Sequence, residues 1–305
     1  MSAGTVVSIE NRELTLTNLD KVLYPADGFT KAQVIDYYAR IAPVMLPHIA
    51  GRAMTLRRFP NGVGGNSFFE KNCPSHRPPW VPVAPVHSGG KDEVVDYCLV
   101  NETATLAWLA NLAALELHAS LAIGADPETP TEVVFDLDPG APAAFVQCCE
   151  IALVLREVLE AAGLQAWPKS SGSKGLQVYV PLNTPHDYTQ TSAFAHKVAQ
   201  EIEERMPKRV TSNMRKDLRT GKIFIDWSQN SRHKTMAAVY SLRAVQRPMA
   251  SAPLTWDEVA AVAAKRDASL GMFDSSHVLA RVERLGDLFA PVATTRQELP
   301  GGNLG

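Results

Sequence analysis

The most constraining feature of the sequence is a short apolar segment that carries two acidic residues, VVFDLDPG at residues 133–140. Alternate side chains of a β-strand share a face, so Asp136 and Asp138 project together, about 7 Å apart. Phe135 and Leu137 then point into a core. Two ionised carboxylates on one face of an apolar strand repel each other unless a cation neutralises them. Because all the donors are oxygen atoms, Mg²⁺ or Mn²⁺ is the expected cation.

A second apolar segment offers a third carboxylate. The sequence IFIDW at residues 223–227 predicts a strand with Asp226 near its end. If this strand pairs near the first one, three carboxylates converge. Such a trio is the minimum for two-metal phosphoryl transfer, in which one ion activates the attacking oxygen and the other stabilises the leaving group.

The two-aspartate motif alone leaves three interpretations open. It is compatible with the metal site of a polymerase-like enzyme. It is also compatible with turn chemistry before Pro139 and Gly140, in which case Asp226 only caps a strand. The third interpretation is the nucleophile motif of haloacid-dehalogenase-type phosphatases, although those continue with Gly-Thr or Gly-Val and lie close to the N-terminus.

A glycine-rich loop offers donor groups for phosphate, although most loops of this composition are simply flexible turns. The segment KSSGSKG at residues 169–175 lies between a predicted helix and a predicted strand. Exposed backbone N–H groups, the Ser171 hydroxyl and the Lys174 ammonium are donors for an anion. The order of residues differs from a Walker loop, and a strand follows instead of a helix. The loop therefore predicts a triphosphate site only beside the carboxylates.

Two adjacent aromatic residues, Phe68 and Phe69, follow a pair of glycines. They predict either a platform that stacks on a nucleic-acid base or one core phenylalanine beside one on the surface. The net charge of the chain is −2, but residues 205–247 contain eleven Lys and Arg, Arg219 among them, against two Asp. This basic block predicts a phosphate-binding surface. The alternative is a solvated charged face.

Helix and strand signals alternate without a strict βαβ rhythm, which predicts an α+β fold. A capping box at Thr30 and Gln33 predicts a helix that is interrupted at Pro43. The other predicted helices cover residues 103–117, 144–162, 192–206 and 256–265, and the predicted strands cover residues 14–23, 54–59, 132–138, 176–180 and 223–227.

Cysteine spacing and apolar runs restrict the protein class further. The four cysteines form no CxxC pair and have no histidine at zinc-ligand spacing, so we expect four reduced thiols and no zinc. No apolar run has the length of a membrane span, and the N-terminus has no signal pattern. We therefore expect a cytoplasmic protein that is not associated with a membrane.

Taken together, these segments resemble the polymerase domain of bacterial ligase D, which belongs to the archaeo-eukaryotic primase superfamily and serves non-homologous end joining. The resemblance extends from about Leu14 to about Leu288 and removes the phosphatase interpretation. It rests on residues 16–25 (LTNLDKVLYP), 68–71 (FFEK), 135–140 (FDLDPG), 172–176 (GSKGL), 224–230 (FIDWSQN) and 240–243 (YSLR).

The resemblance implies a fold and a domain plan. The fold is an archaeo-eukaryotic primase-like core in which two β-sheets flank a catalytic cleft and helices lie outside. The whole chain, residues 1–305, is then a single primase-polymerase domain. Residues 1–125 provide DNA-end and template contacts, residues 126–295 the catalytic core, and residues 296–305 a tail.

The resemblance also implies roles for individual residues. The metal ligands are Asp136, Asp138 and Asp226, with Mn²⁺ usually favoured over Mg²⁺. The incoming NTP or dNTP is held by residues that match the family's nucleotide site: Arg57, His118, Ser171, Lys174, Gln177 and Arg243. The DNA contacts are Lys21 and Lys31 for a 5′-phosphate, Phe68 and Phe69 for the template, and Arg219 in the basic block.

The implied function is template-directed, ribonucleotide-preferring nucleotidyl transfer. It fills gaps or extends ends in DNA repair such as non-homologous end joining or excision repair, with an ATP-dependent DNA ligase and Ku as partners. Gln177 is a departure, because the family commonly has histidine there and glutamine cannot carry charge. The alternative is therefore a catalytically weak module that binds or bridges DNA ends and recruits a ligase. The start Met-Ser-Ala favours a stand-alone gene product.

Overall fold

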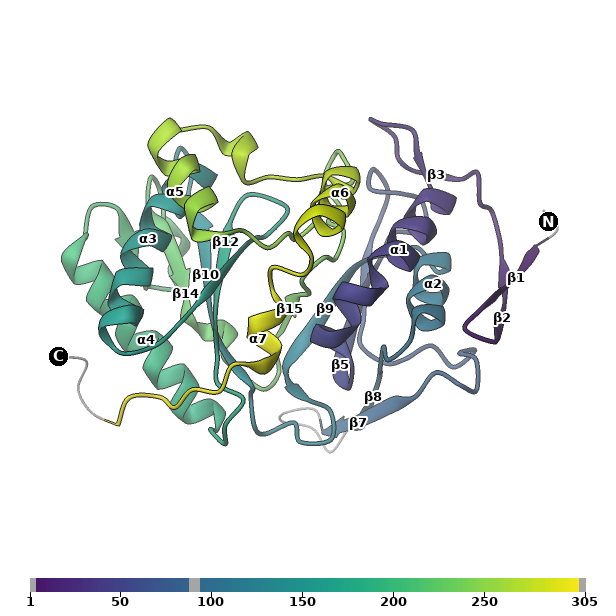
Figure 1. The fold of residues 1–305 in the computed structure, drawn as a ribbon, viewed down its shortest axis with the longest axis horizontal. Coiled ribbons are helices and arrows are strands. Elements are labelled where there is room, and N and C mark those ends of the chain that lie inside the picture. The colour runs from purple at the N-terminus through teal and green to yellow at the C-terminus, as the bar shows by residue number, and fades with distance from the viewer. Residues whose placement is uncertain (1–3, 88–93, 302–305) are drawn as a thin grey trace. The chain divides into compact units, whose positions relative to one another are not determined.

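The computed structural model describes residues 4–87 and 94–301. The chain divides into two compact units (Figure 1). The first unit consists of Met1–Ala125, Thr235–Ala250 and Asp274–Asp287, and the second of Asp126–Lys234, Ser251–Phe273 and Leu288–Gly305. The assignment of residues 1–305 to one domain stays a prediction.

The first unit contains a sheet with the strand order β15-β9-β5-β8-β7, and β6 also pairs with β5. These strands are β5 (Arg52–Arg58), β6 (Phe68–Glu70), β7 (Val83–His87), β8 (Val94–Cys98), β9 (Ala114–Ile123) and β15 (Thr235–Ala237). Two small antiparallel ribbons precede it, β1 (Thr5–Ile9) with β2 (Arg12–Leu16), and β3 (Val22–Tyr24) with β4 (Phe29–Thr30). The single strand predicted over residues 14–23 is wrong, because the backbone turns at Asn18, where φ is 52°.

The helices of the first unit are α1 (Lys31–Ile49), α2 (Thr103–Asn111) and α6 (Ser275–Leu285). The capping box predicted at Thr30 and Gln33 begins α1. The predicted interruption at Pro43 is wrong, since α1 continues through Pro43 and Pro47. Its buried stripe includes Tyr38, Met45 and Ile49 and packs beside α2, so tertiary burial outweighs the lost backbone hydrogen bond.

The predicted helix over residues 103–117 is correct only in its first half. Helix α2 ends at Asn111, Ala113 adopts a left-handed φ of 57°, and the chain continues as β9. The Ala- and Leu-rich run has no clear hydrophobic period, so the local sequence does not distinguish helix from strand. Pairing of β9 with β5 and β15 decides it.

The second unit contains a sheet with the strand order β11-β12-β10-β14-β13. Its strands are β10 (Glu132–Pro139), β11 (Trp167–Ser170), β12 (Leu176–Pro181), β13 (Val210–Thr211) and β14 (Ile223–Asp226). Its helices are α3 (Phe145–Ala161), α4 (Tyr188–Arg205), α5 (Trp256–Lys265) and α7 (Ala290–Thr294), with short 3-10 turns at Lys216–Leu218, Trp227–Gln229 and Ala268–Leu270.

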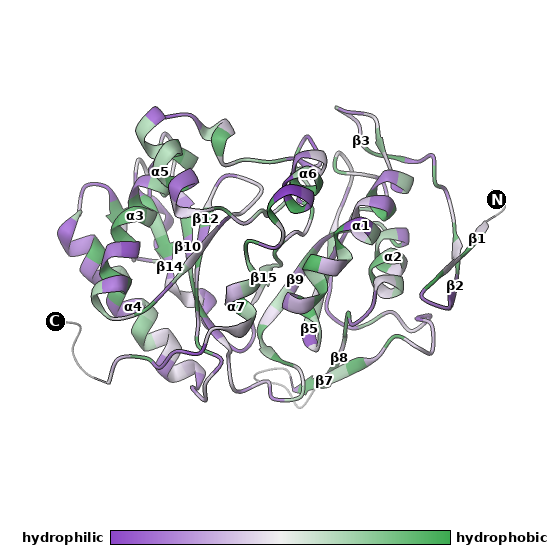
Figure 2. Cartoon of the chain, in the orientation of Figure 1, coloured by the Kyte–Doolittle hydropathy of each residue, from purple (hydrophilic) through white to green (hydrophobic). Residues whose placement is uncertain are grey.

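One face of this sheet is covered by helices. Phe135 and Leu137 of β10 are fully buried in a core that also includes residues of α3 and α4, such as Ile151 and Val198. Figure 2 shows hydrophobic and hydrophilic residues side by side along α3 and α4, as expected for helices with one buried face. Side chains that alternate with Phe135 and Leu137 therefore point away from these helices.

The α+β prediction is confirmed, since helices and sheets are mixed in both units. Among the described residues, no helix is both long enough and apolar enough to cross a membrane.

The prediction of four reduced thiols is wrong for two of them. Cys73 and Cys98 form a disulfide, whereas Cys148 and Cys149 are buried free thiols. The backbone N–H of Cys73 donates to the carbonyl of Asp96 at 2.6 Å. This contact brings the loop after β6 onto β8, where the Cα atoms of the pair lie 4.9 Å apart, within bonding range. The sequence separation of 25 residues gave no sign of this proximity.

Replacing both Cys73 and Cys98 with serine is expected to lower the free energy of unfolding by about 3 kcal/mol, because the bond restricts a long loop in the unfolded chain. Urea unfolding of the two proteins measures the difference. A reductant should destabilise the native chain to the same extent and leave the double variant unchanged. A native chain that unfolds identically with and without reductant contradicts the prediction.

Candidate active site

The three aspartates predicted as metal ligands come together on one face of the sheet of the second unit. Strand β14 is antiparallel to β10, with Asp226 directly opposite Asp136 and Phe224 opposite Asp138. Asp136 and Asp138 alternate with core residues Phe135 and Leu137, so the carboxylates point away from α3 and α4. The sequence could predict the three acids but not the register that sets Asp226 against Asp136.

The environment of Asp136 disfavours its charged form. Burial raises its pKa to about 7, the nearby carboxylates of Asp138 and Asp226 add to the increase, and a hydrogen bond from Gln177 opposes it. The Gln177 Nε2 atom donates to Oδ1 of Asp136 at 3.0 Å. Gln177 itself lies opposite Asp136 in the pairing of β10 with β12. The ionised form of Asp136 is therefore costly without a positive charge.

Asp226 is held by the residues that follow it. Its Oδ1 accepts from the backbone N–H of Ser228 at 3.1 Å, and its Oδ2 accepts from Nε2 of Gln229 at 2.8 Å. Within residues 4–87 and 94–301, the side chains as they stand form no group of three or more His, Cys, Asp or Glu able to hold a metal ion. Both Asp136 and Asp226 already bind side-chain amides.

The donor set nevertheless fits a divalent cation. Three carboxylates share one face, and their mutual repulsion contributes to the raised pKa of Asp136. A bound cation removes that penalty because it stabilises the ionised forms. Oxygen donors of this kind match Mg²⁺ or Mn²⁺.

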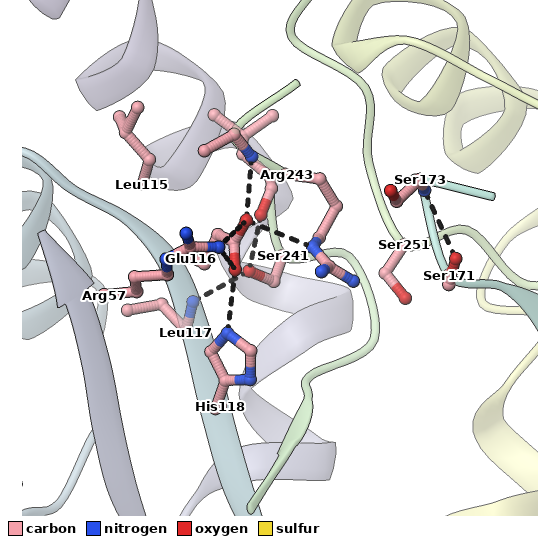
Figure 3. Close-up of polar contacts among 12 residues, drawn as sticks. Arg57, Leu115, Glu116, Leu117, His118, Ser171, Ser173, Ser241, Arg243 and Ser251 are labelled. Atoms are coloured by element: carbon pink, nitrogen blue, oxygen red, sulfur yellow. Dashed lines mark hydrogen bonds and ion pairs between the residues drawn. The ribbon is translucent and has the colours of Figure 1, made fainter. Parts of the chain in front are cut away.

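The Gly-Ser loop lies against this face. A Cβ atom on Gly175 would stand 2.6 Å from the carbonyl oxygen of Leu137 and 3.5 Å from Oδ1 of Asp138. The Ser171 hydroxyl accepts from the backbone N–H groups of Ser173 and Gly175, at 3.2 and 3.0 Å, which closes a tight turn (Figure 3). Lys174 is exposed at its tip. The loop thus places Lys174 and Ser171 near Asp138.

Arg219 borders the same face. Its guanidinium stacks 3.6 Å from the centroid of the Phe224 ring, and Phe224 shares the carboxylate face because it lies two residues before Asp226. The backbone of Arg219 packs directly on Gly140, where a Cβ atom would not fit. A cation therefore lies beside the end of β10 that carries Asp138.

In the first unit, Glu116 is the centre of a charged cluster that contains three predicted nucleotide-binding residues (Figure 3). It is 2% exposed. His118 Nε2 bonds one carboxylate oxygen at 2.9 Å, Arg57 Nη1 lies 3.5 Å away, and Arg243 Nε lies 3.4 Å away. Glu116 and His118 share a face of β9 because they are two residues apart. The helix predicted over residues 103–117 did not place Glu116 and His118 on one face of a strand.

Opposing effects fix the charge of the cluster. Burial alone would raise the pKa of Glu116, but the hydrogen bond from His118, the Arg243 charge and the Ala244 N–H lower it to about 2. Burial lowers the pKa of His118, and its bond to Glu116 opposes that decrease. Glu116 is therefore an anion that orients two guanidinium groups and one imidazole.

The strand-like segment with Arg243 is anchored on α1. The Tyr38 hydroxyl accepts from the Leu242 N–H at 3.0 Å, and the Tyr24 hydroxyl donates to the Arg243 carbonyl at 3.1 Å. The Ser241 hydroxyl accepts from the Leu117 N–H at 2.9 Å. The backbone that positions Arg243 is thus fixed on both sides.

Phe68 and Phe69 lie on the short strand β6 and are 45% and 60% exposed. The guanidinium groups of Arg58 and Arg57 each lie 5.3 Å from one of the two ring centroids. Phe69 also meets His118 edge-on at 5.8 Å. The interpretation of one core phenylalanine is wrong, since both rings are exposed.

Lys21 and Lys31 lie near each other at the start of α1. Lys31 is 5% exposed and donates to the Thr17 carbonyl at 2.6 Å, while Lys21 donates to Asn61 at 3.1 Å. Burial, and then the charge of Lys21, lower the pKa of Lys31 to about 8. Two ammonium groups that repel each other form a place where an anion is stabilising.

The basic block of residues 205–247 is less positive than its composition suggests. Many of its arginines form ion pairs with acidic residues, most of them outside the block: Arg205 with Glu201, Arg209 with Glu150, Arg215 with Asp217, Arg232 with Glu128, Arg243 with Glu116, and Arg247 with Asp27.

A surface hollow of about 540 Å³ lies in the second unit and is lined by residues such as Gln200, Glu203 and Trp227. Trp227 stacks on His196 of α4 at 3.9 Å and packs against the helix-covered core. The hollow is therefore on the α4 side of the sheet, away from the carboxylates.

Comparison with known proteins agrees with this geometry. Residues 30–289 match the family model described as the primase-polymerase domain of LigD. The multifunctional non-homologous end joining protein LigD of Mycolicibacterium smegmatis is 46% identical over 280 residues, which is 91% of this chain and 36% of that protein. The bifunctional LigD of Bacillus subtilis is 30% identical over 94% of this chain and 45% of its own length.

A solved structure matches as well. The polymerase domain from Mycobacterium tuberculosis ligase D in complex with DNA has a TM-score of 0.85 and 43% identity, and the match covers 93% of this chain and 99% of that one. The class of the protein is therefore a DNA-directed nucleotidyltransferase. Within this class, the chain belongs to the LigD primase-polymerase domain family. It spans little more than a third of the mycobacterial relatives.

Glu116→Gln removes the central anion of the charged cluster without changing its shape. The pKa of Glu116 in the folded chain is about 2, against an ordinary value of 4.5, which corresponds to about 3 kcal/mol of stability. Because the folded pKa is depressed, this contribution is full above about pH 4.5 and disappears as the pH falls through about 2. The difference in unfolding free energy between native and variant chains should follow that course. The matched change at exposed Glu283 should have almost no effect.

Asp138→Asn should stabilise the metal-free protein, with a larger gain at pH 8 than at pH 5. The carboxylate of Asp138 helps to raise the pKa of Asp136 to about 7, so the native chain loses stability as the pH rises through that value. The variant lacks this repulsion. Thermal unfolding in a chelator at both pH values measures the difference, and equal gains at the two pH values contradict the idea.

Proposed function

We propose that the chain extends a primer 3′-end opposite a DNA template at gaps or breaks, prefers ribonucleotides, and holds its divalent ions on Asp136, Asp138 and Asp226. The observation that carries the proposal is the register that sets Asp226 opposite Asp136. This register brings the aspartates of two separate sequence motifs onto one face of the sheet. Asp138 lies two residues along the same strand, which gives the trio that two-metal transfer needs.

The roles of the chain's own residues follow from this face. Asp136, Asp138 and Asp226 are the ligands, and Mn²⁺ is the ion we expect to be favoured. When bound, divalent ions supply charge neutralisation at the α-phosphate and activation of the attacking hydroxyl. Ser171 and Lys174 bind the triphosphate, since the loop that carries them packs on Asp138. Gln177 contributes a neutral donor.

The charged cluster of the first unit binds the nucleotide through Arg57, Arg243 and His118. Glu116 neutralises part of their charge and fixes their orientation, so the cluster is arranged before the nucleotide arrives. Guanidinium groups are good ligands for phosphate because they donate two parallel hydrogen bonds.

DNA is held by three further groups. Phe68 and Phe69 stack on template bases, a contact worth about 1–3 kcal/mol per base. Lys21 and Lys31 bind a 5′-phosphate, which relieves the repulsion between them. Arg219 binds the backbone near Asp138. Most of this affinity is electrostatic, so it should weaken steeply with salt.

The relatives are named for non-homologous end joining. We propose that this chain serves end joining or excision repair in the bacterial nucleoid, followed by an ATP-dependent DNA ligase and recruited by Ku.

Asp138→Ala is expected to abolish extension of a gapped duplex while binding to the same DNA persists, because the variant loses a metal ligand and no DNA contact. The assay uses NTPs and dNTPs with Mn²⁺, on substrates with and without a 5′-phosphate. Asp257→Ala, a change at an exposed aspartate of α5, should leave extension unchanged. Undiminished extension by Asp138→Ala excludes the proposed site.

The same assay decides whether the chain is only a module that bridges DNA ends. Such a module would bind the 5′-phosphorylated gap yet extend no primer with either kind of nucleotide. Extension by the native chain therefore excludes the bridging function as the sole role.

A further inference from the structure

A row of polar side chains crosses the sheet of the second unit at the level of the carboxylates. Lys169 of β11 lies opposite Gln177 of β12, Gln177 lies opposite Asp136 of β10, and Asp136 lies opposite Asp226 of β14. Directly opposed residues point to the same face of a sheet. The row therefore connects the metal face with a lysine two strands away from β10.

Lys169 is fully buried, with 0% of its surface exposed. Its ammonium donates to Oε1 of Gln177 at 2.5 Å and to the Ser251 hydroxyl at 2.6 Å. The Tyr179 ring lies 5.3 Å from the same nitrogen. A buried ammonium is retained only where oxygen acceptors compensate for its lost hydration.

The chemistry of Lys169 decides how the Gln177 amide is turned. An ammonium has three donors and no acceptor, so the group that faces it must be the carbonyl oxygen of the amide. The NH₂ group then faces the other way, and Nε2 donates to Oδ1 of Asp136 at 3.0 Å. Without the ammonium, either orientation of the amide is available, and one of them directs an oxygen at the carboxylate.

Ser251 links this arrangement to a distant part of the sequence. Its hydroxyl donates to the Ser170 carbonyl at 2.9 Å. The following residues run beside β11, where the Ser170 N–H donates to the Ala252 carbonyl at 2.8 Å and the Leu254 N–H donates to the Pro168 carbonyl at 3.0 Å. This segment covers β11 and holds an acceptor against the buried ammonium.

We propose that Lys169 is a positioning residue for the metal site, which acts through Gln177 by fixing the amide so that an N–H, and not an oxygen, meets Asp136. The inference rests on the proposed role of Asp136 as a metal ligand. It explains how glutamine can serve at this position, because the buried lysine supplies the orientation that the amide lacks on its own. Partners of this kind change metal affinity by about 10–100-fold when removed.

The test is a double-variant cycle on the full chain, with Mn²⁺ binding measured from the electron paramagnetic resonance signal of free Mn²⁺. Lys169→Met removes the donor and keeps the length of the side chain. Gln177→Leu removes the amide. Lys169→Met should weaken Mn²⁺ binding about tenfold in the native background and less than about twofold in the Gln177→Leu background, because the two changes interrupt one connection.

Several outcomes contradict the proposal. Equal losses of Mn²⁺ affinity in the native and Gln177→Leu backgrounds show that Lys169 acts through its charge or through folding. No loss of affinity in either background shows that Lys169 does not act on the site. Lys265→Met removes the same charge from an exposed position outside the basic block and should leave Mn²⁺ binding unchanged. Extension by Lys169→Met should recover most of its maximal rate at saturating Mn²⁺, whereas a general folding defect would not be rescued.

Two further variants keep the result interpretable. If Lys169→Met does not fold, Ser251→Ala keeps the ammonium but removes one of its acceptors. It should weaken Mn²⁺ binding a few-fold, and only when Gln177 is present. The same effect in both backgrounds, or no effect in either, contradicts the proposal.

Asp136→Asn separates the proposed metal ligand from the proposed positioning role of Lys169. If it binds Mn²⁺ as the native chain does, the metal assignment fails. If it loses binding while Lys169 has no influence, only the positioning role fails.

Discussion

Repulsion among carboxylates on one sheet face is the constraint around which the second unit is arranged. The strands place Asp136, Asp138 and Asp226 together, while the opposite face is closed by α3 and α4. Burial of such charges is unfavourable, and the raised pKa of Asp136 records that cost. The neighbouring groups are donors or cations: the Gln177 amide, Lys169 behind it, and Arg219 at the end of β10. The hydrogen bond from Gln177 and the charge of Lys169 both lower the pKa of Asp136 and so reduce this cost.

In the first unit the signs of the charges are reversed. There, two guanidinium groups and an imidazole would repel one another, and one buried carboxylate, Glu116, compensates for them. The depressed pKa of Glu116 and the raised pKa of Asp136 are thus complementary. One carboxyl group is stabilised as an anion by the cations around it, and the other remains costly as an anion until a cation binds.

The sequence predicted the acidic residues of the site better than the long-range contacts that hold them in place. Alternation along residues 133–138 was enough to place Asp136 and Asp138 on one face, and the cap at Thr30 was readable because both of its partners are local. Glu116 was missed because residues 114–117 resemble a helix, and only pairing with β5 makes them a strand. Lys169 was assigned to the glycine-rich loop, whereas it is a buried residue of β11, because its partner Ser251 lies 82 residues away in the sequence. Contacts of that range, like the Cys73–Cys98 bond, have no local signature.

The division of the chain into units has a consequence for biosynthesis. The polypeptide passes from one unit to the other after residues 125, 234, 250, 273 and 287. A domain formed from one continuous stretch can fold as soon as that stretch has left the ribosome. Neither unit here is formed from one continuous stretch, so neither can fold in this way. The first is incomplete until Asp274–Asp287 have been made, and the second needs the final stretch of the chain as well. Each core is therefore completed only after synthesis has passed Asp274–Asp287, so the two cores mature nearly together.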